Sequence, residues 1–398
     1  MTALAPPSTR PDRASVEDWQ AGGFALYVHW PFCTSKCPYC DFNSHVAAAI
    51  DQSAWLAAFR GEIRRAAAET PGRVLRSIFF GGGTPSLMDP DVVAGVIEEA
   101  ALAWRFANDI EITLEANPGS VEQGRFRAYA GAGVNRLSMG VQALNDEDLR
   151  RLGRLHSVAD AQAAFDIARA QFSRVSFDLI YGRQHQSRAA WRQELRQALG
   201  MAVDHLSLYQ LTIEDGTAFG ARAAAGKLAG LPCDDLAADM YLDTQEICAA
   251  AGLPAYEISN HAAPEAESRH NLVYWRQGDW VGIGPGAHGR LTLHGGMRHA
   301  TEAIRAPSAW LAAALQGSGE MPRHAIPLNE QAIEYLLMSL RLSEGMDMSR
   351  HAALAGKALD QGALADLAGM GLIVVEGERL RVTPAGRPVL NAILRALA

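Results

Sequence analysis

Three cysteines, Cys33, Cys37 and Cys40, lie within eight residues near the start of the chain, with C-x3-C-x2-C spacing. A cluster of thiols in a short segment predicts a metal site rather than a disulfide framework. Three thiolates can bind three irons of a [4Fe-4S] cluster, which leaves the fourth iron open to another ligand. Zinc is the alternative, with His29 or His45 as the fourth ligand, but zinc sites commonly use paired C-x2-C spacings. The spacing therefore favours the cluster.

Two further features could bind a ligand beside those thiols. The glycine triplet 81–83, followed by Thr84, comes directly after an apolar run, and backbone without side chains allows a ligand to approach closely. A tight turn between a strand and a helix is the other interpretation of that triplet. Glu115 and Asp178 stand in or just beyond apolar runs, where an unpaired charge is costly. These carboxylates are either solvated at the edge of a sheet or bind a ligand.

The elements that position these residues are short apolar strands that alternate with helical stretches, a pattern typical of parallel sheets. The predicted strands are 25–29, 77–80, 111–115, 136–139, 175–180 and 206–211. The predicted helices are 53–68, 90–104, 121–131, 146–152, 158–170, 189–201 and 234–251. Six such units form three-quarters of a barrel, and function gathers at the carboxyl ends of the strands in barrels and open sheets alike. Each feature above lies at such an end, so we expect an α/β fold with a partial (β/α)6 barrel over 23–255.

The rest of the chain divides into three parts. Residues 1–22 have no periodic apolar pattern and are expected to be a mobile leader. Residues 256–325 are rich in Gly and aromatic residues and are expected to form a connector. From 326 to 398, the predicted helices 330–342 and 364–370, strands 372–375 and 380–382, and helix 385–397 indicate a smaller winged-helix-like α+β domain. That domain has no basic recognition face, so DNA binding is not expected.

Composition excludes several classes of protein. The 398 residues carry a net charge of −8 without a Lys/Arg-rich block, which argues against a nucleic-acid partner. No run of 18 apolar residues or signal peptide is evident, so no membrane span is expected. Five cysteines, an odd number with three clustered, indicate a reducing compartment, and the cytoplasm is the expected location. Cys233 and Cys248 are expected to be small buried residues.

The cysteine run, together with the glycine triplet, resembles the radical S-adenosylmethionine (SAM) superfamily. In that family the amino and carboxylate groups of SAM bind the open iron. Electron transfer from the reduced cluster then breaks a C–S bond of SAM to give a 5′-deoxyadenosyl radical. Segments 27–33, 136–142, 152–156 and 178–182 are similar to the branch that contains the oxygen-independent coproporphyrinogen III oxidases.

That resemblance implies a set of residues that contact SAM. The set is Tyr27, Tyr39, Gly82, Gly83, Thr84, Glu115, Gln142, Arg154 and Asp178. The residue types suit the ligand, because carboxylates bind ribose hydroxyls and an ammonium group, and an arginine binds a carboxylate.

Two features separate this chain from the oxidases of that branch. The oxidases have a fourth cysteine two residues after the third, where this chain has Phe42, and they have a longer N-terminal segment that covers the substrate. Both differences argue against oxidative decarboxylation of coproporphyrinogen III.

The segment 270–275, with the sequence HNLVYW, resembles the HNxxYW motif of HemW-type haem chaperones, and the Gly-rich segment 282–289 is also typical of them. The resemblance implies haem contacts at His270, Asn271, Tyr274 and Trp275. An imidazole can ligate haem iron, and aromatic rings offer flat apolar surface to a porphyrin. His288 is the rival iron ligand. The other interpretation is that these aromatic residues close the barrel or dock the second domain, since aromatic clusters are usually core.

The leading hypothesis is a haem chaperone that binds haem and passes it to apo-haemoproteins, on a scaffold that binds a [4Fe-4S] cluster and SAM. Cleavage of SAM is left open, and coproporphyrinogen dehydrogenase activity is not expected. The resemblance also allows transient contact with membrane proteins and suggests a homodimer. The alternatives are a radical SAM oxidoreductase that acts on a tetrapyrrole, such as coproporphyrinogen III, and a scaffold stabilised by zinc.

Overall fold

The structure, a computed structural model, describes residues 18–293 and 295–398, without the side chains of 120–123. Most of the leader predicted for 1–22 therefore lies outside the described residues. Its last part, residues 18–21, forms the short 3-10 helix η1 (Asp18–Ala21), in which Trp19 is buried. Asp18 accepts two hydrogen bonds of 2.7 Å from the guanidinium of Arg350, which ties η1 to the C-terminal part of the chain.

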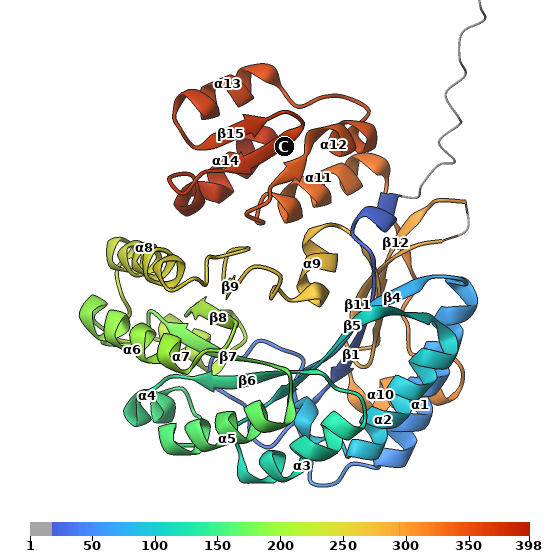
Figure 1. The fold of residues 1–398 in the computed structure, drawn as a ribbon. Helices are drawn as coiled ribbons and strands as arrows, with labels where there is room; N and C mark the ends of the chain where they lie inside the picture. The colour runs from blue at the N-terminus through green and yellow to red at the C-terminus, as the bar shows by residue number, and fades with distance from the viewer. Residues whose placement is uncertain (1–17, 294) are drawn as a thin grey trace, which may run out of the picture.

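Six parallel strands form the centre of the molecule, in sequence order across the sheet (Figure 1). They are β1 (Phe24–Trp30), β4 (Val74–Gly82), β5 (Arg105–Ala116), β6 (Arg136–Gln142), β7 (Arg174–Tyr181) and β8 (His205–Gln210). Each of the six predicted strands overlaps one of these. Adjacent, parallel strands in chain order need a crossover on one face, and the intervening helices supply it. The predicted α/β fold is confirmed.

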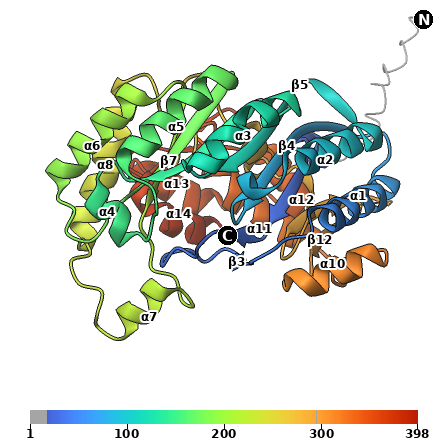
Figure 2. The ribbon, with the colours of Figure 1, turned by 90° about the horizontal axis from the view of Figure 1, so that it is seen from below.

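The helices that follow these strands cover the outer face of the sheet (Figure 2). They are α1 (Gln52–Glu69), α2 (Pro90–Ala103), α3 (Ser120–Gly131), α4 (Asp146–Arg151), α5 (Val158–Gln171), α6 (Arg188–Met201) and α8 (Asp234–Ala250). Side chains at the helix N-termini explain several starting points: Asn145 accepts backbone N–H bonds at α4, and Ser157 forms a capping box at α5. The short helix α7 (Ala218–Ala224) was not predicted, because seven residues show too little of a helical period.

The sheet continues beyond the six parallel strands into the segment 256–325. The strand β10 (Asp279–Ile283) pairs parallel with β1, and β11 (His288–Thr292), β12 (Arg298–Glu302) and β13 (His324–Ala325) follow antiparallel. At the opposite edge, β9 (Asn260–Ala262) pairs antiparallel with β8. The result is one mixed, 11-stranded sheet, with α10 (Pro307–Leu315) against α1. The sequence did not indicate these strands, because they are only two to five residues long and lie among glycines.

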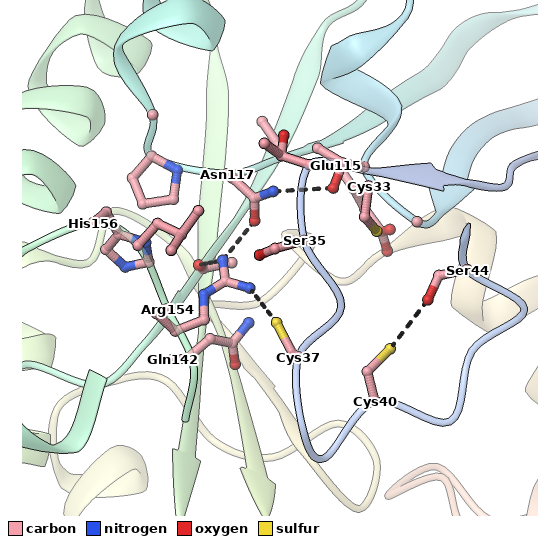
Figure 3. Close-up of a pocket in the computed structure, with 18 of the residues that line it drawn as sticks. Cys33, Ser35, Cys37, Cys40, Ser44, Glu115, Asn117, Gln142, Arg154 and His156 are labelled. Carbon is pink, nitrogen blue, oxygen red and sulfur yellow. Dashed lines mark hydrogen bonds between the residues drawn. The ribbon is translucent and has the colours of Figure 1, made fainter. Parts of the chain in front are cut away.

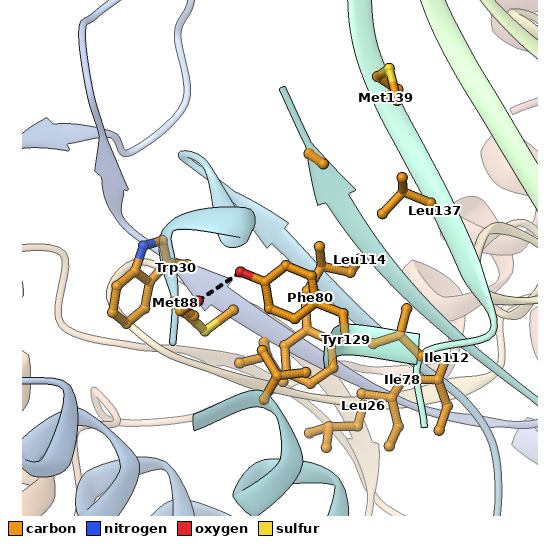
Figure 4. Packing of buried hydrophobic residues seen from close by; sticks show 14 of the residues in the cluster. Leu26, Trp30, Ile78, Phe80, Met88, Ile112, Leu114, Tyr129, Leu137 and Met139 are labelled. Atoms are coloured by element: carbon orange, nitrogen blue, oxygen red, sulfur yellow. Dashed lines mark hydrogen bonds between the residues drawn. The ribbon is translucent and has the colours of Figure 1, made fainter. Parts of the chain in front are cut away.

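The core lies between the sheet and the outer helices (Figure 4). Leu26, Ile78 and Leu114 come from neighbouring strands and are completely buried or nearly so, together with Phe80. Burying one such side chain contributes about 1.5–3 kcal/mol. The hydroxyl of Tyr129, on α3, donates to two backbone carbonyls, so the polar end of this buried ring is satisfied. The core fixes the strands whose carboxyl ends carry the site.

The C-terminal residues form a second core of their own. Its elements are α11 (Leu328–Ser339), β14 (Met346–Asp347), α12 (Met348–Ala355), α13 (Gln361–Gly369), β15 (Ile373–Glu376), β16 (Arg379–Val382), η3 (Arg387–Val389) and α14 (Leu390–Leu397). The three strands form a small antiparallel sheet, and the order of elements is winged-helix-like. Three details differ from the sequence analysis: β14 and α12 were not predicted, and the last helix begins at Leu390 rather than 385, because Pro388 lies within η3. Figure 1 shows this domain beside α8, β9 and α9 (Arg269–Trp275).

Candidate functional site

The cysteine segment lies at the carboxyl end of β1, between the short strands β2 (Phe32–Cys33) and β3 (His45–Val46). Cys33, Cys37 and Cys40 are each partly exposed and line one cavity of about 520 Å³, which we call the first cavity (Figure 3). The segment is also held by α7, because Phe219 N donates to Pro38 O at 2.8 Å. Burial raises the pKa of the Cys33 and Cys40 thiols.

The donors around this cavity fit an iron–sulfur cluster better than zinc. No three His, Cys, Asp or Glu side chains among the described residues are placed to hold one metal ion. A cubane cluster has a different requirement, since each thiolate binds a separate iron and the sulfur atoms remain apart. Both ring nitrogens of His29 are engaged, with Tyr27 Oη at 2.9 Å and Asn43 O at 3.0 Å, so His29 offers no free donor to zinc.

The glycine triplet packs directly against the cysteine segment. Gly82 has φ = +110°, and a Cβ atom there would lie 2.7 Å from the ring of His29. A Cβ atom on Gly83 would lie 2.7 Å from the carbonyl oxygen of Phe32. The next backbone N–H groups pair with the same segment, because Gly83 N donates to Trp30 O at 2.6 Å and Thr84 N to Phe32 O at 2.8 Å. Only glycine fits this close approach.

Glu115, next to the end of β5, and Asp178, within β7, line the same cavity. Burial raises the pKa of Glu115 to about 8, and the negative charge of Asp178 adds to the increase. Burial also raises the pKa of Asp178, to about 6, against the opposing effect of a hydrogen bond from Ser207. Asp178 Oδ1 has no hydrogen-bond partner among the described residues. Two carboxyl groups held in a poorly solvated cavity favour a cationic ligand that would stabilise their charged forms.

Arg154 connects the cysteine segment to the neighbouring strand ends (Figure 3). Its guanidinium donates to Cys37 Sγ at 3.4 Å, to Asn117 Oδ1 at 2.5 Å and to Gly140 O at 2.8 Å. Asn117 in turn donates to Thr84 Oγ1 at 3.1 Å. Sequence reasoning missed Asn117, although a polar residue directly after β5, which ends at Ala116, is a signal for such a position.

The structure brings eight of the nine predicted SAM contacts to the first cavity. The eight are Tyr39, Gly82, Gly83, Thr84, Glu115, Gln142, Arg154 and Asp178. Gln142 has φ = +74°, next to an irregularity in the pairing of β6 with β7. A positive φ at a non-glycine residue is uncommon and often marks a functional site. Tyr27 does not line the cavity and instead packs against Phe79 and His270.

A larger cavity of about 880 Å³, the second cavity, adjoins the first. The two share Tyr39, Cys40, Phe42, Glu115, Gln142 and Asp178. The second cavity continues from these residues to the C-terminal domain, where Arg341, Arg387 and Leu390 line it. Phe42 is 59% exposed and stands where the two cavities meet.

The segment 270–275 lies elsewhere, in helix α9, and lines neither cavity. His270 is buried, and both of its ring nitrogens have partners, with Nδ1 2.9 Å from Ser77 Oγ and Nε2 2.6 Å from Tyr274 Oη. Its ring stacks on Phe79, and burial lowers its pKa to about 3, which keeps the imidazole neutral. Trp275 packs with a small apolar cluster that includes Leu342 of the C-terminal domain. This arrangement matches the interpretation in which the segment closes the barrel and docks the second domain.

Four other residues were singled out in the sequence: Asn271, His288, Cys233 and Cys248. Asn271 is only partly buried, and His288 is exposed in β11, with its ring 4.0 Å from Glu302. The structure therefore does not bring the four predicted haem contacts or His288 to either cavity. The expectation that Cys233 is buried is wrong: it is exposed just before α8, because the helix N-terminus begins at the surface. Cys248 is buried, as expected.

Comparisons with known proteins place this geometry in a family. A model of the "Radical SAM superfamily" matches residues 27–198, and a model of the "HemN C-terminal domain" matches residues 326–389. "Heme chaperone HemW" of Escherichia coli is 36% identical over 93% of this chain and 97% of its own length. The mitochondrial "Radical S-adenosyl methionine domain-containing protein 1" of Bos taurus is 38% identical over 94% of this chain and 87% of its own. The chain therefore belongs to the radical SAM superfamily, in the family that contains HemW and its mitochondrial relatives.

The fold has a close counterpart among solved structures. Coproporphyrinogen III oxidase (HemN) of Escherichia coli superposes with a TM-score of 0.78 over 95% of this chain and 92% of its own, at 24% sequence identity. This likeness establishes the arrangement of barrel and C-terminal domain. Membership of the superfamily implies a [4Fe-4S] cluster and SAM as cofactors, and the residues of the first cavity fit both.

Proposed function

We propose that this protein is a haem chaperone, which binds haem and transfers it to apo-haemoproteins on a scaffold that holds a [4Fe-4S] cluster and SAM. The relatives named as haem chaperones match nearly the whole chain, so both domains support the proposal. The observation that carries it is the pair of joined cavities at the carboxyl ends of the strands, one with the thiols and one large enough for a further ligand.

The residues of the first cavity have distinct roles in this proposal. Cys33, Cys37 and Cys40 hold the cluster, and Arg154 positions the thiolate of Cys37 through its 3.4 Å contact. Glu115 and Asp178 bind the cationic groups and hydroxyls of SAM, and the backbone at 82–84 allows its close approach. When bound and reduced, the cluster supplies an electron that can cleave a C–S bond of SAM.

A histidine ligand of the haem iron would be His270 or His288, and ligation by either would place the haem at α9 or β11, because neither residue lines the two cavities. Coordination by His270 requires that Nε2 leave Tyr274 or that Nδ1 leave Ser77, since both nitrogens are engaged. His288 is exposed and needs no such rearrangement. The remaining predicted contacts, Asn271, Tyr274 and Trp275, accompany His270 on α9.

The partners in this proposal are haem and apo-haemoprotein recipients, with transient contact to membrane proteins and a homodimer. Within the described residues, no helix is long and apolar enough to cross a membrane. All five cysteines are free in the structure, which suits a reducing compartment such as the proposed cytoplasm. A relative named as mitochondrial belongs to the same family.

The test is a titration of anaerobically reconstituted protein with haemin, followed by absorbance in the Soret region. Binding should give a new Soret band at stoichiometric haemin. The same preparation should convert no coproporphyrinogen III to protoporphyrinogen IX in the presence of SAM and a reductant. An unchanged haemin spectrum together with formation of protoporphyrinogen IX would show an oxidase instead.

A further inference from the structure

The second cavity has walls of opposite charge, and they come from different parts of the chain. Its five carboxylates, Asp41, Glu115, Asp178, Glu214 and Asp234, belong to the barrel. Its two cationic residues, Arg341 and Arg387, belong to the C-terminal domain. Two of the carboxylates, Glu115 and Asp178, lie where the second cavity meets the first, whereas both arginines lie where the C-terminal domain lines it. A ligand with an anionic edge has one favourable orientation in such a field.

Arg341 and Arg387 each have guanidinium N–H donors that are left available for a ligand. Arg341 donates from its guanidinium to Leu337 O, and Arg387 donates to Arg341 O at 3.1 Å. Within the described residues, neither guanidinium has a carboxylate oxygen at ion-pair distance, although a guanidinium carries five N–H donors. Burial lowers the pKa of both groups, which is the effect that a bound anion would offset.

Glu257, the carboxylate whose charge affects both guanidinium groups, already accepts hydrogen bonds from other groups. Glu257 accepts hydrogen bonds from Ile258 N at 2.6 Å, from Ser259 N at 3.2 Å and from the side chain of Asn260. It influences both guanidinium groups only at longer range. Tyr241 Oη, which also lines the cavity, is buried and has no hydrogen-bond partner among the described residues. The basic end therefore holds donors that protein groups do not satisfy.

Between the two ends, the cavity offers apolar and aromatic surface. Phe42, Ile180, Tyr209, Ile258 and Leu390 line it. Phe42 and Tyr209 are 59% and 42% exposed, so their rings are accessible from within the cavity. Flat apolar walls with two cationic groups at one end suit a planar, apolar ligand that carries two carboxylates along one edge.

We propose that the second cavity binds the tetrapyrrole, with its two propionate carboxylates on Arg341 and Arg387 and its opposite edge toward the first cavity. This assignment rests on the proposed function and specifies where the haem lies. It excludes His270 and His288 as ligands of haem bound there, because neither residue lines the second cavity. It makes the C-terminal domain a direct part of the binding site. Phe42, in the position where the oxidases have a further cysteine, becomes a wall against which the macrocycle packs.

The experiment compares haemin with its dimethyl ester, in which both carboxylates are neutral, on the full-length reconstituted protein in one detergent. The ester lacks both charge-assisted contacts, and each is worth about tenfold in affinity. The unmodified protein should therefore bind haemin about a hundredfold more tightly than the ester. Equal affinity for the two ligands would overturn the assignment. No Soret change with haemin would overturn the proposed function as well, so the two failures are distinguishable.

Variants then locate the carboxylate contacts. Arg341→Met and Arg387→Met keep most of the aliphatic length, and each should weaken haemin binding about tenfold without weakening binding of the ester. The matched control is Arg395→Met, on the exposed side of α14, which should bind both ligands as the unmodified protein does. Loss of haemin and ester binding in equal measure would contradict the assignment. If a variant does not fold, the comparison of the two ligands on the unmodified protein decides.

Discussion

The cysteine segment and the segment 270–275 are both short motifs, but their surroundings differ: the first lines a cavity, and the second is packed against neighbouring elements. The three thiols are partly exposed and line a cavity together with Asp178, whose Oδ1 has no hydrogen-bond partner among the described residues. His270 is buried, and Ser77 and Tyr274 satisfy both of its nitrogens. A site prepared for a ligand keeps donors and acceptors unpaired, whereas a structural cluster pairs them internally. The comparison distinguishes a ligand-binding segment from a structural one, which the sequence alone does not.

The largest expected effect is on the cysteine side. Cys37→Ala should abolish binding of the [4Fe-4S] cluster, because two thiolates remain for a site that needs three. Iron and sulfide content after anaerobic reconstitution measures the loss. Cys233→Ala, which removes an exposed thiol outside the cavity, is the control and should retain full iron content. Cluster formation by Cys37→Ala at the normal level would contradict the assignment of the thiols.

On the other side of the comparison, His270→Ala should act mainly on stability. The substitution leaves a cavity next to Phe79 and removes hydrogen bonds from the buried Ser77 hydroxyl and from Tyr274. We expect a decrease of about 2–4 kcal/mol in the free energy of unfolding. Denaturant titration measures it, with Asn271→Ala as the neighbour on the same helix. A His270→Ala variant of unchanged stability that no longer binds haemin would reassign His270 to the haem.

A third prediction concerns pH and the cationic ligand. The pKa of Glu115 is about 8 in the folded chain against an ordinary 4.5, so the folded state holds a proton that the unfolded state releases. Without SAM, the free energy of unfolding should therefore fall as pH rises from about 4.5 to about 8, by at most about 1.4 kcal/mol per pH unit. In Glu115→Gln, the free energy of unfolding should no longer fall between pH 6 and pH 8. Below about pH 6 it should still depend on pH, because Asp178 titrates there.

The affinity for SAM should change in the opposite direction. SAM is a cation and prefers the carboxylate form of Glu115, so its binding should strengthen as pH rises toward 8. Equilibrium dialysis of labelled SAM at pH 6 and pH 8 measures this dependence. An affinity that falls over this range would show that Glu115 does not face the cation.

The smallest effect is expected at Asn271, which is partly buried and has no side-chain hydrogen bond among those the structure shows. Asn271→Ala should change the free energy of unfolding by less than about 0.5 kcal/mol. Haemin titration of this variant sharpens the comparison, because it tests the segment without disturbing the core. Weaker haemin binding at unchanged stability would place haem at α9.

Local pattern predicted much of the site, and long-range packing determined the rest. The spacing of Cys33, Cys37 and Cys40 and the six strands that end beside them are features of contiguous sequence. The contact of Arg154 with Asn117 joins positions 37 residues apart, and no periodic signal reveals it. The second cavity depends on Arg341 and Arg387, which meet the barrel only after the C-terminal domain has docked. The division of the chain at 22, 255 and 325 stays a prediction.

The most direct test of the account is transfer of haem from this protein to a recipient. Reconstituted protein loaded with one equivalent of haemin is mixed with an apo-haemoprotein that has a distinct Soret maximum, and the spectrum is followed with time. We predict that the band of the loaded protein decays as the recipient's band appears, with SAM and the cluster present. Haem that stays on the loaded protein, together with conversion of coproporphyrinogen III in the parallel assay, would contradict the account.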